Sequence, residues 1–334
     1  MSRLWGFLLI TLTVCMPISA QEPLATIPYA MENNRIKMTI PYQGIELWLM
    51  LDTGASTTVM FQDPMFEDMA LSDGPLINFP AFEEQYRTKR IPNITLDMGG
   101  LDVTFGNVVM MPYEETISTQ MSIGYDGIIG QELFVQFAVL VDPETLTINL
   151  YPSGTDFSET FRRRYPLQMV NTRPHVTFTS QLPWEYRSTE KEFLIDTGYP
   201  GSLVIWDEEE FKRAVPDFLT RRRMKEENQG VVTYANLLFA KQRFSRIPIF
   251  IGANPPKQAK KGVGLLGASL LNHFKYALDF ENKSLWAQDR DLKFTISKYI
   301  TSEIYTPNQE EYIVRKHYFI PGSTAKSVIV LSDK

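Results

Sequence analysis

An internal repeat constrains this chain more than any other feature of its sequence. Residues 127–148 (GIIGQELFVQFAVLVDPETLTI) match residues 264–285 (GLLGASLLNHFKYALDFENKSL) when the sequence is displaced by 137 positions. Upstream of each copy an apolar segment runs into Asp-Thr-Gly, as LWLMLDTGAS at 47–56 and as EFLIDTGYPGS at 192–202, and these two loops lie 144 positions apart. A period of this length indicates two paralogous lobes.

Apolar runs separated by turn residues predict a mostly β fold. The runs are rich in β-branched and aromatic residues, as strands are, and glycine pairs or Gln-Gly mark the turns between them. We expect strands at 36–40, 45–51, 94–98, 101–111, 231–240 and 244–251. Short helices are expected at 131–137, 207–215 and 269–274.

The first twenty residues have the pattern of a secretory signal peptide. Arg3 precedes an apolar run that ends at Val14, and the small residues Ser19 and Ala20 follow. A membrane anchor would need about 20 apolar residues, and Pro17 interrupts the run earlier. We therefore expect cleavage after residue 20 and an exported protein, secreted or periplasmic, that keeps no membrane span.

The remaining chain divides at a change of composition. Residues 27–152 form the expected N-terminal lobe, 153–164 a linker with glycine, serine and clustered charges, and 165–290 the C-terminal lobe. Residues 291–334 match neither copy. They are interpreted as a strand-forming tail docked on the second lobe, with the alternative of a fragment similar to a PDZ module, because PGSTA at 321–325 resembles a stretch of that module.

Composition excludes several kinds of functional site. The one cysteine, Cys15, lies within the expected signal peptide, so the mature chain has no disulfide, no thiol nucleophile and no thiolate metal site. His175, His273 and His317 are too scattered for a metal site. No motif for a nucleotide, a dinucleotide or a serine nucleophile occurs, and a net charge of -6 without a basic face argues against nucleic acid. We expect no metal, no cofactor and carboxylate chemistry.

The two Asp-Thr-Gly loops supply the candidate carboxylates. If the lobes pack about a pseudo-twofold axis, Asp52 and Asp196 meet across it, because symmetry brings equivalent points near the axis together. Two carboxylates in contact cannot both stay ionised, so they would share one proton. Such a pair can take a proton from water and give one to a substrate carbonyl, which is general acid–base hydrolysis without a covalent intermediate.

These motifs resemble those of two-lobed aspartic peptidases of the pepsin and retropepsin clan. The resemblance rests on both Asp-Thr-Gly loops and on Ile128-Ile129-Gly130 and Leu265-Leu266-Gly267, and it covers about residues 35–290. Ala55 and Tyr199 follow the loop glycines, where pepsins usually have a hydroxyl residue, so the loops are more similar to retropepsin-like bacterial secreted proteins.

The resemblance implies a fold and roles for individual residues. The fold is two homologous β-barrel lobes related by pseudo-twofold symmetry with a cleft between them, and Asp52 and Asp196 are the catalytic pair. The loop supports are Thr53 and Thr197, which brace the two loops, and Gly54 and Gly198, which donate backbone amides to the acids. Flaps that cover substrate would lie around 83–90 and 229–236, with Tyr86 and Tyr234 as candidates to close on it.

Three hypotheses follow from this sequence. The first is an exported aspartic endopeptidase that cuts extended polypeptide segments and acts as a monomeric pseudo-dimer. The second is a non-catalytic two-lobed peptide-binding protein of the same fold. The third is a β-rich envelope or scaffold protein whose Asp-Thr-Gly turns only cap strands, and it predicts that the two acids lie far apart.

Overall fold

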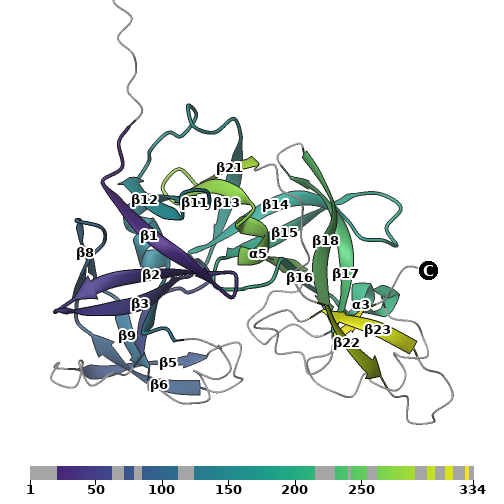
Figure 1. Cartoon of the computed structure of the whole chain (residues 1–334), viewed down its shortest axis with the longest axis horizontal. Coiled ribbons are helices and arrows are strands. Elements are labelled where there is room, and N and C mark those ends of the chain that lie inside the picture. Colours follow the sequence, from purple (N-terminus) through teal and green to yellow (C-terminus); the bar gives the residue numbers. More distant parts are fainter. Residues whose placement is uncertain are drawn as a thin grey trace, which may run out of the picture.

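The computed structural model describes residues 21–61, 71–78, 85–111, 124–214, 230–239, 242–253, 262–289, 299–304, 313–318 and 328–330. The expected signal peptide, residues 1–20, lies outside these ranges. The described chain is mostly β, as predicted, and its two halves lie side by side with a shared sheet between them (Figure 1).

The shared sheet is antiparallel and takes strands from both halves in the order β1–β12–β11–β20–β21–β13. Its strands are β1 (Ala25–Glu32), β11 (Phe137–Asp142), β12 (Thr147–Pro152), β13 (Arg164–Val170), β20 (Phe274–Asp279) and β21 (Ser284–Asp289). The halves join where β11 pairs with β20, and β1 and β13 each continue from this sheet into the barrel of their own half.

The first half forms the sheet β2–β3–β10–β4–β9–β6–β5. Its strands are β2 (Arg35–Tyr42), β3 (Ile45–Leu51), β4 (Thr58–Phe61), β5 (Ser72–Asn78), β6 (Gln85–Ile91), β9 (Val108–Met111) and β10 (Gly127–Ile129). A separate hairpin of β7 (Ile94–Asp97) and β8 (Asp102–Phe105) packs beside β2, and α2 (Gln131–Gln136) follows β10.

The second half repeats this order and closes it into a barrel. The pairs run β14–β15–β19–β16–β18–β17 and return from β17 to β14. Its elements are β14 (Arg173–Gln181), β15 (Thr189–Asp196), β16 (Leu203–Trp206), α3 (Glu208–Ala214), β17 (Gly230–Phe239), β18 (Gln242–Gly252), β19 (Val263–Gly267) and α5 (Ala268–Leu271). In both halves the strand before the short helix runs parallel to the strand that carries Asp-Thr-Gly.

The C-terminal tail adds strands to the second half. Its elements are β22 (Tyr299–Ile304), β23 (Ile313–Tyr318) and β24 (Val328–Val330). β22 and β23 form a hairpin, and β24 pairs in parallel with the first residues of β17. The tail therefore docks on the barrel of the second half by backbone pairing.

Two sequence expectations are wrong in detail. The strand expected over 101–111 is broken into β8 and β9, because the Glu132 carboxylate accepts hydrogen bonds from the backbone amides of Gly106 and Asn107 at 2.6 and 3.2 Å and holds a turn there. The helix expected over 269–274 is the shorter α5, and Phe274 already begins β20 because it joins the buried core of the shared sheet.

The linker is packed against the shared sheet. Phe157 and Phe161 are buried in an apolar cluster with Leu140, Ala277 and Trp286, which come from both halves. Their rings also contact each other edge to face, with centroids 6.1 Å apart. Because burial of an aromatic side chain is worth roughly 1.5–3 kcal/mol, the linker helps to fix the two halves relative to each other.

Candidate active site

Each Asp-Thr-Gly loop begins where a buried strand ends. In the first half, the Asp52 amide donates to the Ile129 carbonyl at 2.9 Å, so the parallel neighbour β10 fixes the end of β3. The helices that follow hold the loops from below. The Gln131 amide donates to the Ala55 carbonyl at 3.0 Å, and its counterpart, the Ala268 amide, donates to the Tyr199 carbonyl at 2.8 Å. The apolar-glycine segments therefore support both loops.

The threonine hydroxyl group of each loop forms hydrogen bonds with the backbone of the opposite half. The Thr53 hydroxyl donates to the Ile195 carbonyl at 2.7 Å and accepts from the Thr197 amide at 3.1 Å. The Thr197 hydroxyl donates to the Leu51 carbonyl at 2.8 Å and accepts from the Thr53 amide at 3.0 Å. Both threonines are fully buried. The four bonds lock one loop against the other.

The glycines let the two carboxyl groups come together. The Gly54 amide donates to Asp52 Oδ1 at 2.7 Å, and the Gly198 amide donates to Asp196 Oδ1 at 3.1 Å. A Cβ on Gly54 would lie 2.8 Å from Cγ of Asp196, and a Cβ on Gly198 would overlap the Asp52 carboxyl group. Each acid therefore rests on the backbone of the opposite loop, and the hypothesis of a scaffold with distant acids is wrong.

Burial dominates the electrostatics of this pair. It raises the pKa of Asp52, against the stabilising hydrogen bond from the Gly54 amide. Burial, with the charge of Asp52 added to it, raises the pKa of Asp196 to about 8. Both residues nevertheless keep part of their surface exposed. The pair can therefore hold one proton in the neutral range and still meet water.

The turn between β1 and β2 reaches across to the second loop, which the sequence analysis missed. The Arg35 Nε donates to the Gly198 carbonyl at 2.8 Å, and the Asn34 side-chain amide donates to the Pro200 carbonyl at 3.1 Å. Asn272, after α5, donates in turn to the Asn34 carbonyl at 2.8 Å. Residues of the first half thus hold the loop of Asp196.

The second half contacts the loop of Asp52 in a similar way, through hydrogen bonds between uncharged side chains. The Thr172 hydroxyl, in the turn between β13 and β14, donates to Gln131 Oε1 at 2.6 Å, and Gln131 Nε2 donates to the Thr53 carbonyl at 3.2 Å. A sequence signal for both turns exists, since Asn33-Asn34-Arg35 and Asn171-Thr172-Arg173 match at a displacement of 138 positions. All four asparagine and threonine residues of these turns have positive φ, as the tight turn requires.

The flap residues remain predictions. Tyr86 lies in β6 opposite Ile77 of β5, and Tyr234 lies in β17 opposite Pro248 of β18. The structure places their backbones in hairpins, but their side chains lie outside the described residues, as do 83–84 and 229 of the two expected flap segments.

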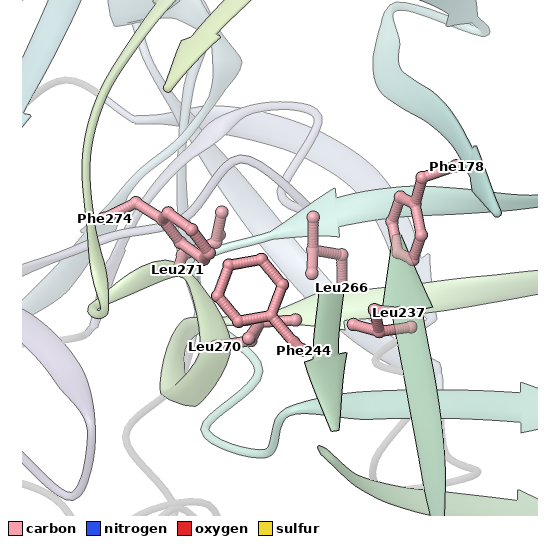
Figure 2. Close-up of a pocket in the computed structure, with 7 residues that line it drawn as sticks. All are labelled: Phe178, Leu237, Phe244, Leu266, Leu270, Leu271 and Phe274. Atoms are coloured by element: carbon pink, nitrogen blue, oxygen red, sulfur yellow. The ribbon is translucent and has the colours of Figure 1, made fainter. Parts of the chain in front are cut away.

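Three further observations concern metal ions, membrane spans and an apolar void. Among them, no group of three or more His, Cys, Asp or Glu residues is placed to hold a metal ion. No described helix is long and apolar enough to cross a membrane. Figure 2 shows a void in the second half that is lined by apolar side chains only, namely Phe178, Leu237, Phe244, Leu266, Leu270, Leu271 and Phe274. Its free volume of about 10 Å³ is at the lower limit of what can hold one water molecule.

Comparisons with known proteins show similarity at the level of the fold alone. No family model matches the sequence, and no curated protein matches it. The fold is similar to the crystal structure of basic 7S globulin from soybean, with a TM-score of 0.47 and 10% sequence identity, over 80% of this chain and 95% of that chain.

Proposed function

We propose that this protein is an aspartic endopeptidase that hydrolyses peptide bonds with a water molecule activated by Asp52 and Asp196. The observation that carries the proposal is the crossed threonine exchange, which holds two buried carboxyl groups against each other. Two carboxyl groups in this position cannot both stay ionised without a large energetic cost, and a turn with a purely structural role has no need of such a pair.

The proposed reaction needs the pair to carry one proton. Because the charge of Asp52 raises the pKa of Asp196, Asp52 ionises first and Asp196 keeps the proton. The Asp52 carboxylate takes a proton from water as the water oxygen attacks the carbonyl carbon, and Asp196 gives its proton to the carbonyl oxygen. The resulting diol collapses when the nitrogen takes a proton from Asp52, the C–N bond breaks, and one hydroxyl returns its proton to Asp196.

The proposed substrate is an extended polypeptide bound between the two halves. The bond that is cut must lie next to Asp52 and Asp196, and these two acids lie near the pseudo-twofold axis. We further propose that the mature protein starts near residue 21, acts outside the cytoplasm and works as a monomer, since one chain supplies both acids. No metal or cofactor takes part in the proposed steps.

The test is digestion of an unfolded polypeptide by residues 21–334. We expect cutting by the parent, inhibition by a statine-type transition-state mimic, and a loss of roughly 10²–10⁴-fold or more in Asp52→Asn and Asp196→Asn. Asp97→Asn is the matched control, because Asp97 accepts a backbone hydrogen bond in an exposed turn. A parent that binds peptides without cutting them would support the non-catalytic peptide-binding protein instead.

A further inference from the structure

We propose that Arg35 is a positioning residue for the Asp52–Asp196 pair. Its guanidinium crosses from the first half to the second, fixes the peptide group that holds Asp196, and supplies the positive charge that a singly ionised pair needs. The proposal rests on the function proposed above for the same site, and it adds a residue to which no motif pointed.

The position of Arg35 is set by the turn before it. Asn33 and Asn34 take the left-handed conformation, with φ of 50° and 65°, and Arg35 is the first residue of β2. Ile36 and Met38 enter the core of the first half, so the side chain of Arg35 leaves the strand on the opposite face. Only 5% of Arg35 is exposed, which is rare for arginine without strong partners.

The hydrogen bond of Arg35 acts on Asp196 through one peptide group. The Gly198 carbonyl, which accepts from Arg35 Nε at 2.8 Å, belongs to the same peptide group as the Tyr199 amide. That amide donates to Asp196 Oδ1 at 2.9 Å. A cationic donor on the carbonyl polarises the peptide and strengthens its N–H as a donor. Arg35 therefore orients the amide and increases its pull on the carboxylate.

The charge of Arg35 acts on the pair directly. Burial raises the pKa of Asp52, and the positive charge of Arg35 opposes that rise. Burial likewise lowers the pKa of Arg35, and the charges of the two acids oppose that decrease. The other ionisable groups around Arg35 are Tyr125 and Tyr199, whose pKa values burial raises, so both are neutral. Glu32 and Lys37 on the same hairpin form an ion pair at 2.8 Å and largely cancel.

The matched position in the second half provides a control. Arg173 begins β14 as Arg35 begins β2, but the loop of Asp52 is held by the neutral Gln131 and Thr172 described above. Among the described residues, no hydrogen bond joins Arg173 to that loop. In the part of the chain that the structure describes, the arginine contact is thus made on the loop of Asp196 and not on the loop of Asp52, which makes the two acids inequivalent.

The experiment compares Arg35→Gln, Arg35→Lys and Arg173→Gln by the pH profile of kcat/KM. We expect Arg35→Gln to move the acidic limb up by about 1 pH unit or more, because an opposite charge near a carboxylate lowers its pKa by roughly 1–3 units. Arg35→Lys keeps the positive charge but not the planar guanidinium group, so the acidic limb should stay at the pH of the parent while the maximal kcat/KM decreases. Arg173→Gln should match the parent in the pH of the acidic limb and in the maximal kcat/KM.

A second readout does not depend on activity. The carboxyl carbons of Asp52 and Asp196 are titrated by ¹³C NMR in the same variants, with each assigned by its Asn variant, and folding is checked by circular dichroism. An upward shift in Arg35→Gln that Arg35→Lys restores supports the inference, even if the parent proves unable to cut peptides. If Arg35→Gln does not fold, the test uses Arg35→Lys alone. Carboxyl pKa values equal to those of the parent then support the inference, and shifted pKa values overturn it. Unchanged titration in Arg35→Gln overturns it whether or not the parent is active.

Discussion

Leu140 of β11 lies directly opposite Ala277 of β20, and Ala277 is the residue that matches Leu140 in the internal repeat. The neighbouring pairs are Val139 with Leu278 and Val141 with Tyr276. Because Val139 matches Tyr276 and Val141 matches Leu278 in the repeat, the symmetry converts one pair into the other. A pseudo-twofold axis therefore passes through the pair of Leu140 and Ala277. The Asp-Thr-Gly loops meet because they too are equivalent points close to that axis.

Removal of one crossing hydroxyl should destabilise the whole protein. Thr53→Val keeps the shape of the side chain but leaves the Ile195 carbonyl and the Thr197 amide without a partner. Each buried group left unpaired costs roughly 1–3 kcal/mol, and 1 kcal/mol shifts Tm by about 2–4 °C in a domain of this size. We expect Tm to fall by about 4 °C or more. Thr104→Val, which loses an exposed threonine–threonine bond, should change Tm little, and equal losses would contradict the role of the crossing.

A methyl group on the loop glycine should abolish activity before it abolishes folding. In Gly54→Ala the new Cβ would lie 2.8 Å from Cγ of Asp196, so the carboxyl group must move. A displacement of about 1 Å at a reacting group can cost 10²-fold in rate, and we expect at least that loss of kcat. In Gly106→Ala the nearest atom lies at 3.4 Å, in ordinary contact, so kcat should remain within a few-fold of the parent. Comparable kcat in the two variants would argue against the pair.

The activity should have a bell-shaped pH profile that is displaced above the ordinary range of carboxylates. The acidic limb, where Asp52 must ionise, should lie above 3.8 because burial raises the pKa of Asp52. The alkaline limb, where Asp196 loses its proton, should lie near 8. The measurement is kcat/KM on one peptide from pH 3 to pH 10. If kcat/KM already decreases as the pH rises past 5, the alkaline limb lies far below 8 and the pair is more acidic than its burial implies.

The same pKa predicts how stability depends on pH. Asp196 has an ordinary pKa of 3.8 when unfolded and about 8 when folded, so the folded state binds the proton more tightly. Stability should therefore be highest below about pH 4 for this group and decrease until about pH 8. Asp196→Asn removes this decrease. Its Tm should exceed that of the parent by a few degrees at pH 8, and thermal unfolding of both proteins from pH 4 to pH 9 measures the difference.

The sequence predicted those features that depend on short segments and on the repeat. The strand ends at Asp52 and Asp196 and the approach of the glycine amides to the acids follow from a local motif that occurs twice, whereas the crossing of Thr53 with Thr197 was implied by the resemblance alone. α2 and α3 were also placed to within one residue at each end, because apolar spacing and neighbouring glycine or proline mark their limits.

The sequence could not predict contacts that join unrelated turns. Arg35 reads as an ordinary charged residue after a turn, and nothing local indicates that its partner is a carbonyl 163 positions away. The same holds for Gln131, which reads as the first residue of an amphipathic helix but bridges Thr53 and Thr172. The break between β8 and β9 depends on Glu132, which lies about 25 residues further along the chain.

The reciprocal support of the two loops has a consequence for biosynthesis. A nascent chain that has emerged only as far as residue 152 contains Asp52, Thr53 and Gly54 but lacks the hydroxyl group and the second acid that complete them. Until the ribosome has also released Asp196 and its barrel has closed, the chain carries one ordinary carboxylate and no shared proton. The paired carboxyl groups therefore form only late in synthesis, after most of the second half has been translated.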